Sequence, residues 1–253
     1  MRYKFWIILL CLVIVSGIVL YGALHKNAYR FPDDANPVIE AFARENQLTY
    51  EQYPESLIQL LERNPETLDY VLNYPLLHNK ERTIDLSIYE NSPTVPLFLQ
   101  WDMQWGYKTY GDDVAGITAC GPMCLSMATY YLTGDVAYSP DKMIEFAENN
   151  DYYSPGNGSS WTLISEGGVK LGFDVTEIPL DKDRIFKNLE VDNPIICVMG
   201  PGDFTTTGHF IVLTGLENGM LRVNDPNSVE NSSKLWDYEQ IKNQIRNIWV
   251  IRK

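Results

Sequence analysis

The chain has 253 residues, of which 45% are hydrophobic and 12% aromatic, so it can bury a sizeable core and is not globally disordered. Its 20 basic and 33 acidic side chains give a net charge of −13, and so acidic a surface argues against nucleic acid as a partner. The length allows one compact domain with additional segments or two small domains, and four cysteines do not make a disulfide framework in a chain this long.

An uncharged apolar run occupies residues 5–24 and follows Arg2 and Lys4. A run of this length can cross the hydrocarbon core of a membrane as a helix. It is longer than the apolar region of a signal peptide and lacks a clear small-x-small cleavage site, which favours an uncleaved anchor over a secreted chain with a cleaved signal. We therefore expect residues 1–26 to be a single-pass membrane anchor, with the rest of the chain outside the cell.

The pattern of residues 27–93 predicts a linker followed by three short helices, here called the N-terminal helical segment. Apolar residues recur at helical spacing after Pro37, after Tyr53 and after Asn64, and Asn64 is a typical helix cap. No cluster of catalytic side chain types occurs in it. The segment is therefore expected to serve as a packing layer or spacer.

The stretch from Thr118 to Gly134 predicts a helix that begins near Cys120. Gly121 and Pro122 suit the tight first turn, because proline lacks only an N–H that would be unpaired there anyway. Gly134 is a typical C-terminal stop. At the start of such a helix, unpaired backbone N–H groups and the positive end of the helix dipole stabilise a thiolate. Cys120 is therefore the candidate nucleophile.

Two neighbouring segments carry further candidates. Residues 94–100 predict a short extended segment ending at Gln100, whose side-chain amide is a candidate oxyanion donor because it donates a hydrogen bond without titrating. Residues 149–160 form a loop rich in Gly, Ser and Asn between the helices expected at 139–147 and 161–171. The loop is either a mobile lip over a cleft or an ordinary surface loop, and the second interpretation is favoured.

The last third of the chain is mostly β-strand. An apolar run at 194–199 predicts a buried strand, and residues 247–251 predict a final one. Between them, the Asn218-Gly219 turn joins two apolar runs into a hairpin. His209 heads the first strand of this hairpin and Asp225 ends the second, so the two side chains lie at the same end of the sheet and can meet.

Cys120, His209 and Asp225 supply the residue types of a thiol hydrolase. A thiol nucleophile needs a nearby base, and the base needs an acceptor that fixes its tautomer. The residue types alone are a weak signal, since many proteins contain them. Their positions at a helix start, a strand start and a strand end strengthen it, because such positions hold side chains rigidly but accessibly.

Three separated motifs are similar to those of a known family: Thr-Ala-Cys-Gly-Pro at 118–122, Gly-His-Phe-Ile-Val-Leu-Thr-Gly at 208–215, and Asn-Asp-Pro at 224–226. Together with residues 95–107 they resemble the C39-like cysteine peptidases of papain-type fold, found mainly in bacteria. The resemblance implies an α+β domain over 94–253, in which the helix bearing Cys120 packs on an antiparallel sheet. No Gly-x-x-x-x-Gly-Lys-Ser/Thr motif occurs, so the transporter-fused form of the family is not expected.

The sequence therefore predicts a cysteine peptidase that cleaves peptide bonds through Cys120, His209 and Asp225 at the outer face of a membrane, with a peptide or protein as substrate and no cofactor. A metal site of these residues with Cys124 is an alternative, but it lacks the spacing of a zinc site. A redox pair of Cys120 and Cys124 departs from the Cys-x-x-Cys form. A catalytically idle papain-like domain that binds peptide or cell-wall ligands is the third alternative, and a transpeptidase would use the same site.

Overall fold

The computed structural model describes residues 35–253, so the predicted anchor at residues 5–24 lies outside the described residues. Within residues 35–253, no helix is both long enough and apolar enough to cross a membrane. The α-helices are α2 (Asn36–Glu45), α3 (Glu55–Arg63), α4 (Leu68–Leu77), α5 (Ala115–Thr118), α6 (Cys120–Thr133), α7 (Pro140–Asn149), α8 (Gly168–Lys170), α9 (Lys182–Leu189), α10 (Val229–Ser233) and α11 (Tyr238–Ile241).

Short helical turns separate several of these helices: η1 (Tyr50–Gln52), η2 (Pro65–Thr67), η3 (Ser87–Tyr89), η4 (Val136–Tyr138), η5 (Leu163–Gly167) and η6 (Lys242–Gln244). The strands are β1 (Thr109–Tyr110), β2 (Asp113–Val114), β3 (Tyr153–Ser154), β4 (Gly158–Ser159), β5 (Asp174–Glu177), β6 (Ile195–Met199), β7 (His209–Glu217), β8 (Met220–Asn224), β9 (Leu235–Trp236) and β10 (Ile245–Arg252).

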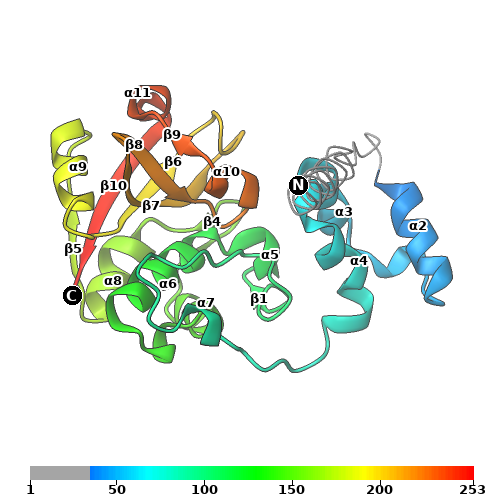
Figure 1. The fold of residues 1–253 in the computed structure, drawn as a ribbon. Helices are drawn as coiled ribbons and strands as arrows, with labels where there is room; N and C mark the ends of the chain where they lie inside the picture. The colour runs from blue at the N-terminus through cyan, green and yellow to red at the C-terminus, as the bar shows by residue number, and fades with distance from the viewer. Residues whose placement is uncertain (1–34) are drawn as a thin grey trace, which may run out of the picture.

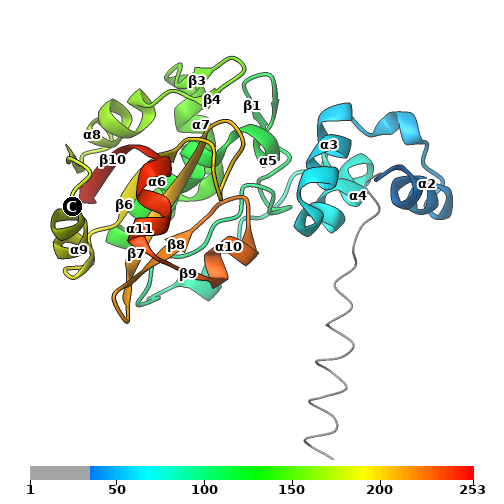
Figure 2. The same ribbon diagram turned by 90° about the horizontal axis from the view of Figure 1, so that it is seen from above.

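The three helices α2, α3 and α4 lie together on one side of the molecule in both ribbon views (Figures 1 and 2). Their apolar faces bury Ile39 and Leu57 completely. Tyr70 of α4 ties this group to the rest of the chain, because its hydroxyl donates to the carbonyl oxygen of Gly106 at 2.7 Å. Its ring also stacks on that of Tyr107, with the two centroids 4.6 Å apart. The N-terminal helices are therefore docked against the remaining chain.

A six-stranded antiparallel sheet forms the centre of the remaining chain, in the order β5-β10-β6-β7-β8-β9. The predicted hairpin is confirmed: β7 pairs with β8, and Glu217 faces Met220 across the turn. Asn218 and Gly219 in that turn have φ angles of 53° and 77°. Positive φ at both central positions is the requirement of the tightest hairpin turns, which explains the Asn-Gly sequence.

The two faces of the sheet bury separate hydrophobic cores. Ile196 and Val198 of β6 point toward the core that surrounds α6, whereas Ile195 and Cys197 point to the opposite core, which α9 and α11 contribute to. This division follows from the alternation of side chains along a strand. Cys197 is fully buried among apolar neighbours and contributes as a small hydrophobic residue.

Helix α6 packs against one face of the sheet, as the α+β prediction required (Figure 1). Buried residues cover nearly its whole circumference from Gly121 to Tyr130, so it is a central helix and not an amphipathic surface one. It ends at Gly134, whose φ of 67° is the left-handed conformation typical of a helix stop. Cys120, the candidate nucleophile at the start of α6, is therefore held by a rigid core element.

Candidate active site

Cys120 is the first residue of α6 and is half-buried. The first turn of the helix fits closely against β4. A Cβ atom at Gly121 would lie 2.6 Å from the hydroxyl of Ser159, so only glycine allows this approach. The Ser159 hydroxyl is in turn 2.9 Å from the hydroxyl of Tyr110. The packing of Gly121 against Ser159 therefore fixes the position of Cys120.

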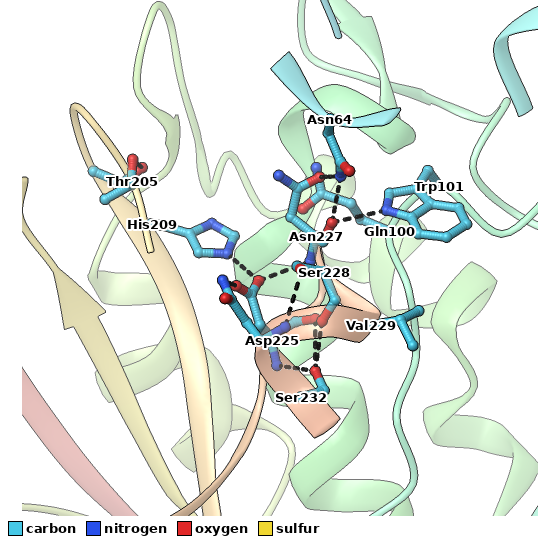
Figure 3. A network of polar contacts seen from close by, with 12 residues as sticks. Asn64, Gln100, Trp101, Thr205, His209, Asp225, Asn227, Ser228, Val229 and Ser232 are labelled. Carbon is cyan, nitrogen blue, oxygen red and sulfur yellow. Dashed lines mark hydrogen bonds and ion pairs between the residues drawn. The ribbon is translucent and has the colours of Figure 1, made fainter. Parts of the chain in front are cut away.

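His209, the first residue of β7, and Asp225, which follows β8, meet at the end of the hairpin as predicted (Figure 3). Nε2 of His209 donates to Oδ1 of Asp225 at 2.7 Å, and both side chains are buried, with 9% and 1% of their surface exposed. Cys120 lies close enough to His209 to raise the pKa of the imidazole. The structure therefore brings the three residues together in the order Cys120, His209, Asp225.

The surroundings of His209 favour its protonated form. Burial disfavours charge on the imidazole, but the Asp225 carboxylate, the hydrogen bond to it and the nearby Cys120 outweigh burial and raise the pKa of His209 from 6.5 to about 10. An imidazolium at neutral pH can stabilise a neighbouring thiolate and can donate a proton to a leaving group.

The Asp225 carboxylate is held by the loop that follows it. Its Oδ1 also accepts a hydrogen bond from the backbone N–H of Asn227 at 2.9 Å, and its Oδ2 accepts one from the side chain of Asn231 at 2.8 Å. The backbone N–H of Asp225 donates to the hydroxyl of Ser232 at 2.9 Å. No sequence motif marks these asparagines, although Asn227 lies two residues after Asp225, at the spacing of a local turn.

A cleft of about 480 Å³ contains both Cys120 and His209 in its lining. Two segments supply much of its lining: β3, β4 and their connection contribute Ser154, Asn157, Ser159 and Ser160, and the loop between β6 and β7 contributes Pro201, Thr207 and Gly208. The loop at 149–160 thus borders the cleft and is not a surface loop remote from the site. Arg246 lines the cleft as well, and no sequence motif marked it.

Gln100 is buried and lies close to the segment that precedes Cys120. Its amide nitrogen donates to the carbonyl oxygens of Gly116 at 2.8 Å and Ile117 at 3.3 Å. Its backbone N–H donates to the carbonyl oxygen of Pro226 at 2.7 Å. Gln100 therefore links the chain before Cys120 with the chain after Asp225, and its oxyanion role stays a prediction.

Cys124 does not have the environment of a redox or metal-binding thiol. It is fully buried, and burial together with the nearby Cys120 raises its pKa well above the usual value of a thiol. A thiol that stays protonated is a poor nucleophile and a poor metal ligand. Within residues 35–253, no group of three or more His, Cys, Asp and Glu side chains is arranged to hold a metal ion.

Comparisons with known proteins place this site in context. The sequence profile of the Peptidase_C39 like family matches residues 93–253. Among solved structures, the peptidase domain of Streptococcus ComA, a bifunctional ABC transporter involved in quorum sensing, is similar at 20% identity and a TM-score of 0.43, over 62% of this chain and 98% of that one. A protein from Bacillus anthracis described as a C39-like peptidase is similar at 13% identity and a TM-score of 0.43, over 63% and 94% of the two chains. No curated protein matches the chain.

Proposed function

We propose that this chain, which belongs to the Peptidase_C39 like family, is a cysteine peptidase that uses Cys120 as nucleophile, His209 as acid and base, and Asp225 as the residue that orients the imidazole. One observation carries the proposal: His209 is hydrogen-bonded to Asp225 and lines the same open cleft as Cys120, which lies close enough to raise the pKa of the imidazole. Nε2 faces the carboxylate, which leaves the other ring nitrogen, Nδ1, for the sulfur.

In the first half of the reaction, the Cys120 thiolate adds to the carbonyl carbon of a peptide bond. The tetrahedral intermediate then collapses, the C–N bond breaks and the imidazolium of His209 gives its proton to the departing amine. The product is a thioester between Cys120 and the acyl part of the peptide. Asp225 holds the ring in the required tautomer throughout, through the hydrogen bond at Nε2.

In the second half, neutral His209 takes a proton from water, the resulting hydroxide oxygen adds to the thioester carbon, and the Cys120 sulfur leaves as the thiolate. If an amine replaced water, the same steps would make the enzyme a transpeptidase. The backbone N–H of Cys120 is the proposed oxyanion donor. Gln100 joins it only if its amide leaves one of the carbonyl oxygens to which it now donates.

We propose that residues 5–24 anchor the chain in a membrane. The support for this anchor is the uncharged run itself, which follows two basic residues. A peptidase domain carried by such an anchor would act on peptides at the outer face of the membrane.

Incubating the full-length chain in detergent with a complex mixture of peptides tests the proposed activity. We expect new peptide termini with the wild-type protein and none above background with Cys120→Ala, because removing the sulfur removes the acyl acceptor. Mass spectrometry of the mixture measures the new termini, and circular dichroism verifies that the variant is folded. Retention of intact peptides by both proteins, without cleavage, would instead identify the idle papain-like domain.

A further inference from the structure

The residues that hold Asp225 form a short chain of hydrogen bonds within residues 225–232, here called the loop after Asp225, which runs from the end of β8 into α10. Asn231 donates to the Asp225 carboxylate through its side chain, and its backbone N–H donates to the hydroxyl of Ser228 at 3.1 Å. Asn227 donates to the same carboxylate through its backbone N–H. The direction of the carboxylate therefore depends on the shape of this loop.

Glu66, from the N-terminal helical segment, contacts this loop at the start of α10. Its Oε2 accepts a hydrogen bond from the backbone N–H of Val229 at 2.6 Å, and its Oε1 accepts from the backbone N–H of Glu230 at 2.9 Å and from the hydroxyl of Ser228 at 3.1 Å. Hydrogen bonds to an ionised carboxylate are stronger than those between neutral groups. A contact path thus runs from Glu66 through Ser228 and Asn231 to Asp225.

Asn64 supplies a second path from the same turn (Figure 3). Its side-chain nitrogen donates to the carbonyl oxygen of Asn227 at 2.6 Å, which also accepts a hydrogen bond from the indole of Trp101 at 3.0 Å. Both backbone polar groups of Asn227 are therefore hydrogen-bonded: its N–H donates to Asp225, and its carbonyl oxygen accepts from Asn64 and Trp101.

Asn64 and Glu66 are themselves held together in η2. The side-chain oxygen of Asn64 accepts a hydrogen bond from the backbone N–H of Glu66 at 3.1 Å, and its backbone carbonyl accepts one from the hydroxyl of Thr67 at 2.7 Å. The turn is followed by α4, which Tyr70 anchors to Gly106. The two side chains therefore reach the loop from a fixed support.

We propose that Asn64 and Glu66 are positioning residues for Asp225, so that the N-terminal helical segment completes the active site and is more than a spacer. This inference rests on the proposed function, because it assigns Asp225 its role toward His209. Without Glu66, two backbone N–H groups and a hydroxyl at the start of α10 lose their acceptor, and the loop is free to turn the carboxylate away from the imidazole. A misplacement of about 1 Å at a catalytic group can lower the rate about a hundredfold.

The test compares Glu66→Ala, Glu66→Gln and Asn64→Ala with the control Glu62→Ala in the full-length protein. Glu62 is an exposed glutamate of the neighbouring helix α3. Two quantities are measured: kcat and KM for a peptide that the wild-type protein cleaves, and the titration of His209 by NMR, which is tractable because the chain has only 3 histidines. The second quantity does not require activity.

We expect Glu66→Ala and Asn64→Ala to lower kcat about 10- to 100-fold with little change in KM, and to lower the pKa of His209. Glu66→Gln should retain part of the activity, because the amide oxygen still accepts hydrogen bonds, and it serves as the test if the alanine variant fails to fold. Folded variants with the kcat and the His209 titration of Glu62→Ala would overturn the proposal. If the wild-type protein cleaves no peptide but the His209 titration still shifts, the proposed function fails and the positioning role stands.

Discussion

Replacing His209 by alanine is expected to lower kcat/KM for peptide hydrolysis by about three orders of magnitude or more. The change removes the charge that stabilises the Cys120 thiolate and also the acid that protonates the departing amine. Among the described residues that line the cleft, no second His and no Asp, Glu or Lys is present to replace it. Steady-state kinetics on a peptide cleaved by the wild-type protein measures the loss.

His78→Ala is the matched control for this experiment. His78 follows α4, its Nδ1 lies 2.8 Å from the carbonyl oxygen of Tyr74, and its ring stacks on Tyr74. It takes no part in the cleft, so its replacement should leave kcat/KM within a few-fold of wild type. Retention of a tenth or more of the activity by His209→Ala would contradict the assignment of the base.

Replacing Asp225 by asparagine is expected to lower kcat by about two to four orders of magnitude and to change its pH dependence. Asparagine keeps the shape of the side chain but removes the charge and permits the wrong tautomer of His209. Because Asp225 raises the pKa of His209, its loss should bring that pKa down toward 6.5. The imidazolium is the acid, so the alkaline limb of the pH–rate profile should move to lower pH.

The same shift predicts how stability depends on pH. The pKa of His209 is higher in the folded protein, about 10, than its ordinary value of 6.5. Protonation of His209 therefore stabilises the folded state fully below about pH 6.5, and this contribution is lost as the pH rises toward 10. Comparing the thermal unfolding of wild type and Asp225→Asn between these pH values isolates the effect.

Asp225→Ala adds a structural penalty to the catalytic one. It leaves His209 and the backbone N–H of Asn227 without their buried acceptor, and loss of one partner of a buried ion pair costs about 3–5 kcal/mol of unfolding free energy. Chemical denaturation measures this value. A pH–rate profile unchanged in Asp225→Asn, together with unchanged stability in Asp225→Ala, would show that Asp225 does not act on His209.

The central elements were predictable because their signals are local. The Gly-Pro sequence after Cys120 predicts a helix start, and the Asn218-Gly219 turn predicts the hairpin that brings His209 and Asp225 to the same end of the sheet. The exact register at that end also depends on a bulge between Leu213 and Gly215. The family resemblance of the three motifs is confirmed by the profile match over 93–253. These features depend on residues close to one another in sequence or on a single turn.

Other elements were missed although a local signal existed. Helix α9 was not anticipated, yet Asp181 caps it by accepting a hydrogen bond from the backbone N–H of Arg184 at 2.9 Å. Ile185 and Leu189 then face the core at helical spacing. The segment carries many charged residues, so its short apolar stripe gives only a weak periodic signal.

The remaining features could not be predicted from sequence, because they depend on packing between distant segments. Glu66 and Asn64 reach the loop after Asp225 from the turn before α4, and α4 docks on a distant segment through Tyr70. Arg246 reaches the cleft because Gly200 offers it room: a Cβ atom there would lie 2.3 Å from the guanidinium Nε. No local pattern marks such contacts.

The alkylation of Cys120 by iodoacetamide, followed against pH in the full-length wild-type protein and in His209→Ala, tests the cysteine peptidase assignment most directly. Peptide mapping identifies the labelled residue. Cys124 and Cys197 are buried, and burial raises the pKa of both thiols, so they should stay unlabelled in the folded protein. We predict rapid alkylation of Cys120 well below about pH 8.5, where free thiols ionise, and a shift of the profile to higher pH in His209→Ala. A wild-type profile that follows a free thiol and does not respond to His209→Ala would contradict the account and leave a binding domain with a peptidase fold.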